Sequence, residues 1–344
     1  MTAVDNPRIA VTMGDPAGIG SEVIAAAYPG LLQHARPLVV GDADVMRDAL
    51  AVRDRGLDVV TVDDPADASF LPEAIPVLDL DNVDGVEYGV VREAYGGASL
   101  EYVERAIELA IDGAVDGMTT APINKQATRL AGSDYAGHTD MLADATDTEN
   151  YSMMLVEGDL RVTHVSTHVP LREACDLVTT DAVLDTVRVT DEALRELGID
   201  DPEIAVAGLN PHASDGGLLG SKDIEEIEPA VEQARSGGIR AYGPESPDTV
   251  FNQAASGAYD CVVAMYHDQG HIPIKMLGFS GGASISGVNV TVGLPIVRTS
   301  VDHGTAFDIA GEGIASEASL VDSVEMAAHI ARQRADGSRI TGDG

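Results

Sequence analysis

The chain has 344 residues, 44% of them apolar, a length and composition that suit a soluble protein of about two domains. Its 57 Asp and Glu against 21 Lys and Arg give a formal net charge of -36, which disfavours nucleic acid and anionic membranes as partners. Because no apolar run reaches the roughly 20 residues that span a bilayer and the N-terminus lacks a signal-peptide pattern, we expect a cytoplasmic protein.

Short β-branched runs alternate with longer amphipathic segments along the chain. Strands are expected at residues 8–14, 37–41, 57–63, 117–123, 160–167, 203–209 and 260–266, and helices at residues 99–115 and 180–197. This alternation predicts an α/β fold in which helices cover parallel sheets. Such sheets bind ligands at the carboxyl ends of their strands, so the residues that follow each run are the candidates for function.

A glycine-rich loop, GDPAGIGSE at residues 14–22, follows the first expected strand. Its glycines permit close backbone approach, and Ser21 is a candidate helix cap. The loop does not match G-x-G-x-x-G, and the chain contains no G-x-x-x-x-G-K-[ST], which makes the standard dinucleotide and P-loop interpretations weak. Taken alone, this loop is interpreted as structural.

Three histidines, His168, His212 and His267, each follow a different expected strand. Three imidazoles at one edge of a sheet, with an open coordination position, suit Zn²⁺, Co²⁺ or a similar ion that polarises a substrate oxygen. For one histidine alone, a hydrogen-bonded loop residue is the simpler explanation, but the convergence of three favours a metal site. His164 lies inside its strand and is expected to be packed.

A second group of side chains has the chemistry of an anion site. On so acidic a chain an anionic ligand needs local cations, and two of the three lysines fall in glycine-punctuated or strand-end motifs. For Arg298 or Lys275 alone, a surface ion pair is the alternative. The candidates are Lys125, His138, Thr139, Lys275, Asn289 and Arg298.

The two cysteines, Cys175 and Cys261, are far apart and are expected to pack as small apolar residues, without a disulfide or a thiolate zinc site. Scarce lysine on a strongly acidic chain is similar to the composition of halophilic proteins, because molar salt screens the self-repulsion of such a surface. An acidic protein of ordinary habitat is the alternative.

Eight motifs occur along the chain in the order GDPAGIGSE, TAPINKQA, GHTDMLAD, RVTHVSTHVPLREA, GLNPHASDGGLLG, DTVF, AMYHDQG and GVNVTVGLPIVRTSVDHGTAFDIAG. In order and spacing they resemble the 4-hydroxythreonine-4-phosphate dehydrogenase family of pyridoxal phosphate biosynthesis. The resemblance spans about residues 8 to 330. It implies a homodimer of subunits with two α/β/α domains related to isocitrate and isopropylmalate dehydrogenases, with the active site in the interdomain cleft at the dimer interface. We expect one domain of residues 1–130 plus 285–344 and another of residues 131–284.

The resemblance implies a role for particular residues of this chain. The divalent metal ligands fall on His168, His212 and His267, shared between dimer partners. Residues 303–315, HGTAFDIAGEGIA, are similar to the adenosine-binding loop of isopropylmalate dehydrogenase and give the cofactor a place. The substrate contacts fall on His138, Thr139, Lys275, Asn289 and Arg298, and the cofactor contacts on His303, Gly304, Thr305 and Asp308.

The implied chemistry is an oxidative decarboxylation of a phosphorylated hydroxy acid. NAD⁺ or NADP⁺ takes a hydride from C3 of the substrate while a divalent ion (Zn, Co or Mg) stabilises the developing alkoxide, and loss of CO₂ then yields 3-amino-2-oxopropyl phosphate. Lys275 is a candidate proton donor or acceptor, and Asp268 a candidate to orient His267.

One residue departs from the expected pattern. His271 stands where the biosynthetic enzymes usually carry an apolar residue, and HDQGHIPIK is more similar to the branch that oxidises 4-phospho-D-threonate or 4-phospho-D-erythronate. The substrate's 2-substituent, amine or hydroxyl, therefore stays open, as do the choice of NAD or NADP and the metal. A non-catalytic binding protein on the same fold is a third alternative, and an isopropylmalate-type enzyme is disfavoured because its metal ligands are aspartates.

Overall fold

The computed structural model describes residues 6–135, 137–280 and 287–341. The chain forms two compact units, Met1–Asp147 with Leu294–Gly344, and Thr148–Gly293. Both consist of parallel or mixed strands with helices against them, so the predicted α/β class with two α/β/α parts is confirmed. The sequence placed the domain boundaries after residues 130 and 284, whereas the two compact units change after residues 147 and 293.

The first unit contains a parallel sheet in the order β3-β4-β2-β1-β5-β12. Thr12 at the end of β1 pairs with Val40 on one side and Thr120 on the other, which aligns the carboxyl ends of three neighbouring strands. Ile9 and Met118 are fully buried in its core. The strands are β1 (Arg8–Thr12), β2 (Arg36–Gly41), β3 (Asp58–Val62), β4 (Ala74–Asp79), β5 (Gly117–Thr120) and β12 (Arg298–Val301).

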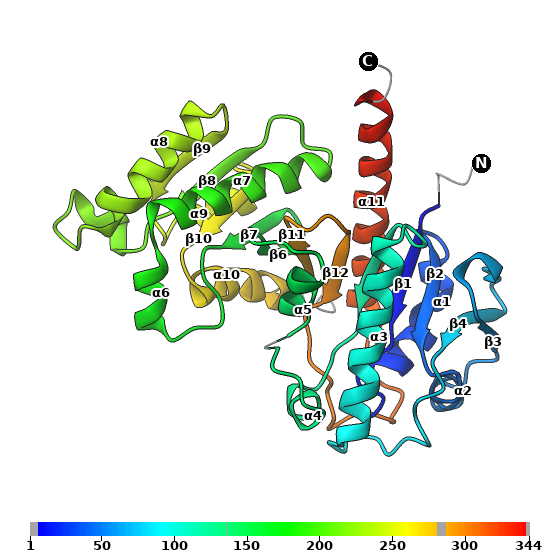
Figure 1. The fold of residues 1–344 in the computed structure, drawn as a ribbon. Helices are drawn as coiled ribbons and strands as arrows, with labels where there is room; N and C mark the ends of the chain where they lie inside the picture. The colour runs from blue at the N-terminus through cyan, green and yellow to red at the C-terminus, as the bar shows by residue number, and fades with distance from the viewer. Residues whose placement is uncertain (1–5, 136, 281–286, 342–344) are drawn as a thin grey trace. The chain divides into compact units, whose positions relative to one another are not determined.

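Helices pack on this sheet in two groups (Figure 1). The long helix α3 lies over β1, β2 and β5, whereas α1 contacts both α2 and α11. None of the helices in the described part of the chain is both long and apolar enough to cross a membrane. The helices are α1 (Gly20–Leu31), α2 (Ala43–Val52), η1 (Pro65–Asp67), α3 (Glu93–Ile111), α4 (Lys125–Leu130), α5 (His138–Ala145) and α11 (Ala318–Thr341).

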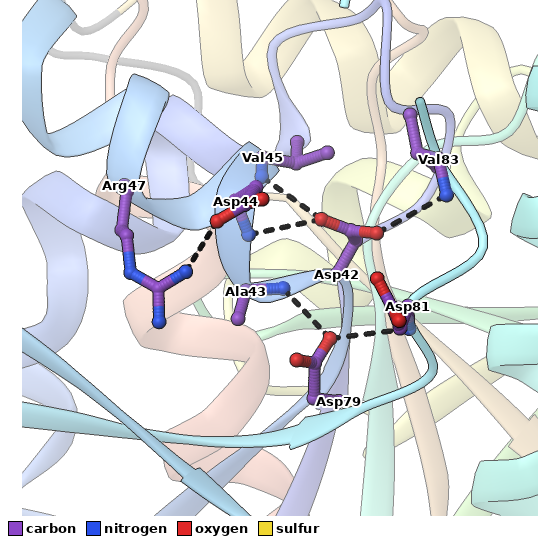
Figure 2. A network of polar contacts seen from close by, with 8 residues as sticks. All are labelled: Asp42, Ala43, Asp44, Val45, Arg47, Asp79, Asp81 and Val83. Atoms are coloured by element: carbon purple, nitrogen blue, oxygen red, sulfur yellow. Dashed lines mark hydrogen bonds and ion pairs between the residues drawn. The ribbon is translucent and has the colours of Figure 1, made fainter. Parts of the chain in front are cut away.

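A buried acidic group at the start of α2 is structural (Figure 2). Asp42 caps the helix, because its Oδ1 accepts from the backbone N–H groups of Asp44 and Val45 at 2.9 and 3.1 Å. Its Oδ2 accepts from Val83 N at 3.1 Å, and Asp79, at the end of β4, accepts from the first helical N–H at 3.0 Å. These bonds account for the burial of Asp42 without a ligand.

The second unit contains a mixed sheet in the order β11-β6-β7-β10-β8-β9. The pairs β11–β6 and β6–β7 are antiparallel, whereas β7, β10, β8 and β9 run parallel, so the predicted parallel arrangement holds for this second group. The strands are β6 (Ser152–Glu157), β7 (Leu160–His164), β8 (Glu203–Ala207), β9 (Arg240–Glu245), β10 (Cys261–Ala264) and β11 (Val288–Val292).

Two groups of helices cover the second sheet (Figure 1). α7 packs on α8 and on the central strands, while α9 and α10 pack on β7 and β10. Val162, Ala205 and Val262 of the strands share one hydrophobic core with Ile274 of α10. The helices are α6 (Leu171–Leu177), α7 (Thr180–Glu196), η2 (Pro211–Asp215), η3 (Asp223–Ile227), α8 (Glu228–Ser236), α9 (Val250–Ala255) and α10 (His267–Ser280).

Candidate active site

Three neighbouring parallel strands of the second unit deliver the three predicted histidines. His168 lies four residues after the end of β7, His212 lies five residues after β8, and His267 begins α10 directly beyond β10. The spatial order β7-β10-β8 brings these strand ends to the same edge of the sheet, as the sequence pattern predicted.

His168 and His267 are close neighbours, with ring centroids 5.6 Å apart and ring planes tilted by 51°. Asp268 Oδ1 lies 2.7 Å from His267 Nδ1. A carboxylate at Nδ1 fixes the imidazole tautomer and leaves Nε2 as the electron-pair donor, the usual arrangement of a histidine that ligates a metal. Asp268, assigned from the sequence to orient His267, contacts the ring nitrogen through which it would do so.

His212 stands apart from this pair. Its side chain is 65% exposed, and its Nδ1 lies 3.8 Å from a carboxylate oxygen of Asp248. Within residues 6–135, 137–280 and 287–341, no group of three or more His, Cys, Asp or Glu side chains is gathered closely enough to hold a metal ion. The donor chemistry, imidazoles flanked by carboxylates, fits a divalent ion such as Zn²⁺, but this single chain does not assemble the three rings around one point.

Side-chain hydrogen bonds join the three strand ends. Ser166, two residues before His168, donates to the carbonyl oxygen of Met265 at 3.0 Å. Gln269 accepts from Met265 N at 2.7 Å and donates to the carbonyl oxygen of Gly208 at 2.7 Å. The orientation of this amide is fixed, because a backbone N–H only donates and a carbonyl only accepts. Gln269 was not singled out from the sequence, although it stands two residues from His267.

His271 packs behind His267. The two rings are stacked, with centroids 3.6 Å apart and planes 11° apart, and His271 Nδ1 lies 3.0 Å from the carbonyl oxygen of His267. The ring of His164 lies 4.8 Å away on β7, so His271 is only 8% exposed. Burial, followed by the charge of His271, lowers the pKa of His164 to about 3, and His164 is a neutral packed residue, as expected.

A separate polar cluster in the first unit contains His138, at the start of α5, and Arg298, at the start of β12. Arg298 is 3% exposed and donates to Thr120 Oγ1 at 2.7 Å, and its Nη2 lies 3.3 Å from His138 Nδ1. Burial lowers the pKa of Arg298 to about 10, so the guanidinium remains charged at neutral pH.

Burial and the charge of Arg298 lower the pKa of His138 well below its usual range. Because guanidinium only donates, His138 Nδ1 accepts and its proton lies on Nε2. Within the part of the chain that the structure describes, this buried Nε2 finds no hydrogen-bond acceptor. The cluster therefore presents an N–H donor beside a buried positive charge, which is suited to a phosphate or carboxylate oxygen.

The other predicted substrate contacts lie in helices and a strand. Thr139 follows His138 in α5. Asn289 lies in β11, and its buried Oδ1 accepts no hydrogen bond from the described residues. Lys275 is a half-buried residue of α10, seven positions after Asp268 and therefore on the same face of that helix.

The predicted cofactor loop rests on the glycine-rich loop at residues 14–22. Ile19 N donates to the carbonyl oxygen of Thr305 at 3.1 Å, and Glu22 Oε2 accepts from Gly313 N at 2.8 Å. A Cβ on Gly18 would meet Thr305 at 3.1 Å, so the two loops approach closely. The glycine-rich loop therefore packs against the segment of the chain to which the sequence assigned the cofactor contacts His303, Gly304 and Asp308.

Asp15 in the glycine-rich loop was not singled out from the sequence. It is 1% exposed, and its Oδ1 accepts from Ala17 N at 2.9 Å. None of the described residues donates to its buried Oδ2. Burial, only partly offset by the Ala17 bond, raises the pKa of Asp15 to about 6. Its position, three residues after the end of a central parallel strand, was the available sequence signal.

Comparison with known proteins places the chain in a family. The family profile described as pyridoxal phosphate biosynthetic protein PdxA matches residues 33–327. The 4-hydroxythreonine-4-phosphate dehydrogenase of Desulforapulum autotrophicum is 45% identical over 94% of this chain and 95% of its own length. The D-threonate 4-phosphate dehydrogenase of Pectobacterium atrosepticum is 45% identical over 94% of this chain and 99% of its own length.

A solved structure agrees with these relatives. The crystal structure of 4-hydroxythreonine-4-phosphate dehydrogenase from Klebsiella pneumoniae has a TM-score of 0.86 and 46% identity, and covers 95% of this chain and 98% of its own. Fold, strand-end chemistry and relatives together define an oxidoreductase of the dehydrogenase class, which uses a nicotinamide cofactor. The chain belongs to the pyridoxal phosphate biosynthetic protein PdxA family, and the resemblance inferred from its motifs is confirmed.

Proposed function

We propose that this protein oxidises the C3 hydroxyl of 4-hydroxythreonine-4-phosphate with NAD or NADP, and that decarboxylation then gives 3-amino-2-oxopropyl phosphate. The observation that carries the proposal is the convergence of His168, His212 and His267 at the carboxyl ends of three adjacent parallel strands. A relative 45% identical over 94% of the chain carries the name of this activity, which supports the same substrate here.

Substrate binding is assigned to donors and cations, because the substrate carries a phosphate and a carboxylate. Arg298 and the Nε2–H of His138 provide a charged and a neutral donor from one buried cluster. Thr139, Lys275 and Asn289 complete the proposed set. On a chain of net charge -36, such local donors are needed to hold an anion against the field of the protein.

The nicotinamide cofactor is assigned to the segment that contains His303, Gly304, Thr305 and Asp308. The backbone bond of Ile19 to Thr305 and the carboxylate of Glu22 hold this segment in place. When bound there, the cofactor would supply the hydride acceptor that oxidation of the C3–H bond requires. The C3 hydroxyl proton passes to Lys275, which later returns a proton to the carbon from which CO₂ departs.

A divalent ion, Zn²⁺, Co²⁺ or Mg²⁺, is assigned to His168, His212 and His267, with ligands shared between two subunits of a homodimer. When bound, such an ion supplies Lewis-acid stabilisation of negative charge on an alcohol oxygen. Asp268 holds the tautomer of His267 that leaves Nε2 available. Sharing is supported by the absence of a complete ligand group among the described residues of one chain.

Exposed apolar side chains of the second unit also support a dimer. Ile272 and Met276 on α10 are 57% and 67% exposed, and Leu218, between η2 and η3, is 81% exposed. They flank the segments that carry His212 and His267, so an interface formed by this surface would bury apolar area beside the proposed ligands.

A second candidate activity is the oxidation of 4-phospho-D-threonate or 4-phospho-D-erythronate, whose 2-substituent is a hydroxyl. The observation that favours it is His271, together with a D-threonate 4-phosphate dehydrogenase among the relatives. Because the His271 ring is stacked on His267 and buried, we expect it to act on the substrate through the position of His267 rather than through a direct contact.

The deciding experiment compares kcat/KM for the 2-amino and 2-hydroxy substrates in the wild type and in His271→Leu, with NAD and NADP each tested. Preference for 4-hydroxythreonine-4-phosphate in both proteins supports the main proposal. Preference for the 2-hydroxy acid that weakens in His271→Leu supports the second candidate. Failure of both substrates to reduce the cofactor in the metal-loaded wild type would refute both candidate functions.

A further inference from the structure

The segment that carries His212 has an unusual backbone. His212, Ala213, Ser214 and Asp215 have φ values of 54, 51, 68 and 46°, a run of four consecutive non-glycine residues in the left-handed region. L-residues visit this region at an energetic cost, and normally one at a time. The other positive-φ non-glycine residues of the described chain are isolated, and they are Asp54, Asp81, Asp147 and Ala306.

One fully buried carboxylate is hydrogen-bonded to this segment on both sides of His212. Asp223, the first residue of the π-helical turn η3, is 0% exposed. Its Oδ1 accepts from Leu209 N at 2.7 Å, and its Oδ2 accepts from Asn210 Nδ2 at 2.6 Å. The hydroxyl of Ser214 also donates to Oδ2, from the far side of His212. The carboxylate therefore connects the residues just before the left-handed run, Leu209 and Asn210, with Ser214 inside it.

Gly208, which has no side chain, leaves space for the Asp223 carboxylate between its hydrogen-bond donors. Gly208 faces the carboxylate so closely that an added Cβ would lie 2.7 Å from Asp223 Oδ1. The carbonyl oxygen of the same glycine accepts from Gln269, which lies two residues after His267. The segment from Gly208 to Asp215 is therefore held by a buried acid on one side and by the start of α10 on the other.

A buried acid that merely stabilised η3 would bond to η3 or to a neighbouring helix. Glu226, a half-buried acid three residues later in the same turn, bonds in this way, because its Oε2 accepts from both the backbone N and the hydroxyl of Thr180 at 2.8 Å. The donors to Asp223 instead come from the strained segment that presents His212. Asp223 and Glu226 therefore bond to different parts of the unit, although both lie in η3.

We infer that Asp223 is a positioning residue that holds the left-handed turn around His212 in the conformation needed for metal binding. This inference rests on the proposed function, in which His212 is a metal ligand. The mechanism is local: without the carboxylate, the 209–215 segment relaxes toward ordinary backbone conformations and the His212 ring loses its fixed position. Preorganised ligands bind more tightly because less order is lost on binding.

The test measures Co²⁺ binding to the full-length protein by calorimetry and by the visible spectrum of the bound ion. We expect Asp223→Asn, which keeps the shape of the side chain but cannot accept every donor, to bind Co²⁺ about 10-fold to 100-fold more weakly, as is typical for residues that support metal ligands. Ser214→Ala, which removes one donor and no charge, should weaken binding several-fold. Glu226→Gln is the matched control and should bind as the wild type does.

Two further measurements separate positioning from general loss of structure. Hydrogen exchange of the metal-free protein should show faster exchange in residues 209–215 of Asp223→Asn, with β7 and β10 unchanged. The His212→Ala/Asp223→Asn double variant should bind Co²⁺ no more weakly than His212→Ala alone, because Asp223 acts through His212.

The outcomes distinguish this inference from the proposed function. Wild-type Co²⁺ affinity in His212→Ala would refute the metal assignment itself. Weakened binding in His212→Ala combined with wild-type binding in both Asp223→Asn and Ser214→Ala would overturn the positioning role and leave the metal assignment intact. Equal weakening in Glu226→Gln would also overturn it, by showing a general effect of destabilising η3.

Discussion

Gln269 and Gly208 are joined by a 2.7 Å hydrogen bond from the side-chain amide to the backbone carbonyl oxygen, while the same amide accepts from Met265 N. One side chain thereby connects the segment after β8 with the end of β10. His212 and His267 follow these two points in the chain. Their relative position therefore depends on Gln269, which is not one of the proposed metal ligands.

The Gln269 bridge can be broken at one end. Gln269→Glu keeps an acceptor for Met265 N but places a carboxylate against the Gly208 carbonyl, so we expect a loss of about 1–3 kcal/mol in the free energy of unfolding. Denaturant unfolding at constant salt measures this loss. The exposed Gln253→Glu on α9 introduces the same charge and should change stability by no more than about 0.5 kcal/mol. Equal losses in the two variants would contradict the role of the bridge.

Asp15 predicts a pH dependence of stability. Its folded-state pKa of about 6 lies above the usual 3.8, so the folded chain binds the proton more tightly than the unfolded chain. The resulting stabilisation is present below the unfolded pKa and is lost as pH rises through about 6. Asp15→Asn should therefore be more stable than the wild type at pH 7.5, by up to about 3 kcal/mol, with the difference shrinking toward about pH 4.5.

Thermal or denaturant unfolding of the two proteins across this pH range gives the result. Asp48→Asn, an exposed site on α2, serves as the control for loss of one negative charge from an acidic surface. A constant difference between Asp15→Asn and the wild type at all pH values would show that the Asp15 carboxyl titrates normally.

His138 should bind substrate as a neutral donor. Loss of a hydrogen bond to a charged group costs about 1.5–3 kcal/mol, so His138→Ala should raise KM about 10-fold to 100-fold. Because the pKa of His138 lies well below its usual range, the ratio of the variant's KM to that of the wild type should stay constant between about pH 6 and 8. A ratio that falls as pH rises would indicate that a protonated imidazolium binds the substrate instead.

The net charge of -36 predicts a dependence on salt. We expect the midpoint of thermal unfolding to rise as KCl is increased from about 0.1 M to molar concentrations, where the Debye length falls to about 3 Å. Sucrose at matched osmolality is the control, because it favours the compact state without screening charge. Full stability in dilute buffer would remove the halophilic interpretation.

Sequence patterns predicted the parallel strands best. All seven expected strands exist, from β1 to β10, because β-branched runs between turns mark buried strands directly. β4, β6 and β9 were not predicted, since AIPVLD contains Pro, SMMLVE is rich in methionine, and RAYGPE contains Gly and Pro. β11 and β12 were read as strand-end motifs within one glycine-punctuated segment, and the antiparallel pairing of β11 with β6 depends on contacts far apart in sequence.

The sequence likewise predicted some residues of the candidate site and missed others. Strand-end histidines are visible in the sequence because position after a strand is a local property. The partners that hold them are not, since Asp223 bonds to residues 9 to 14 positions earlier and Gln269 bonds to a residue 61 positions earlier. The direction of the His271 ring is likewise a product of packing between α10 and β7, where a Cβ on Gly270 would lie 2.4 Å from His164 Nε2.

The central claim is that His168, His212 and His267 hold one divalent ion that the reaction requires. The most direct measurement is the amount of bound metal per chain, by elemental analysis of the purified wild type and of His267→Ala, with His34→Ala as a control histidine paired with Glu325. We predict about one ion per chain in the wild type and in His34→Ala, and near-complete loss in His267→Ala with its fold retained. Unchanged metal content in His267→Ala would contradict the assignment.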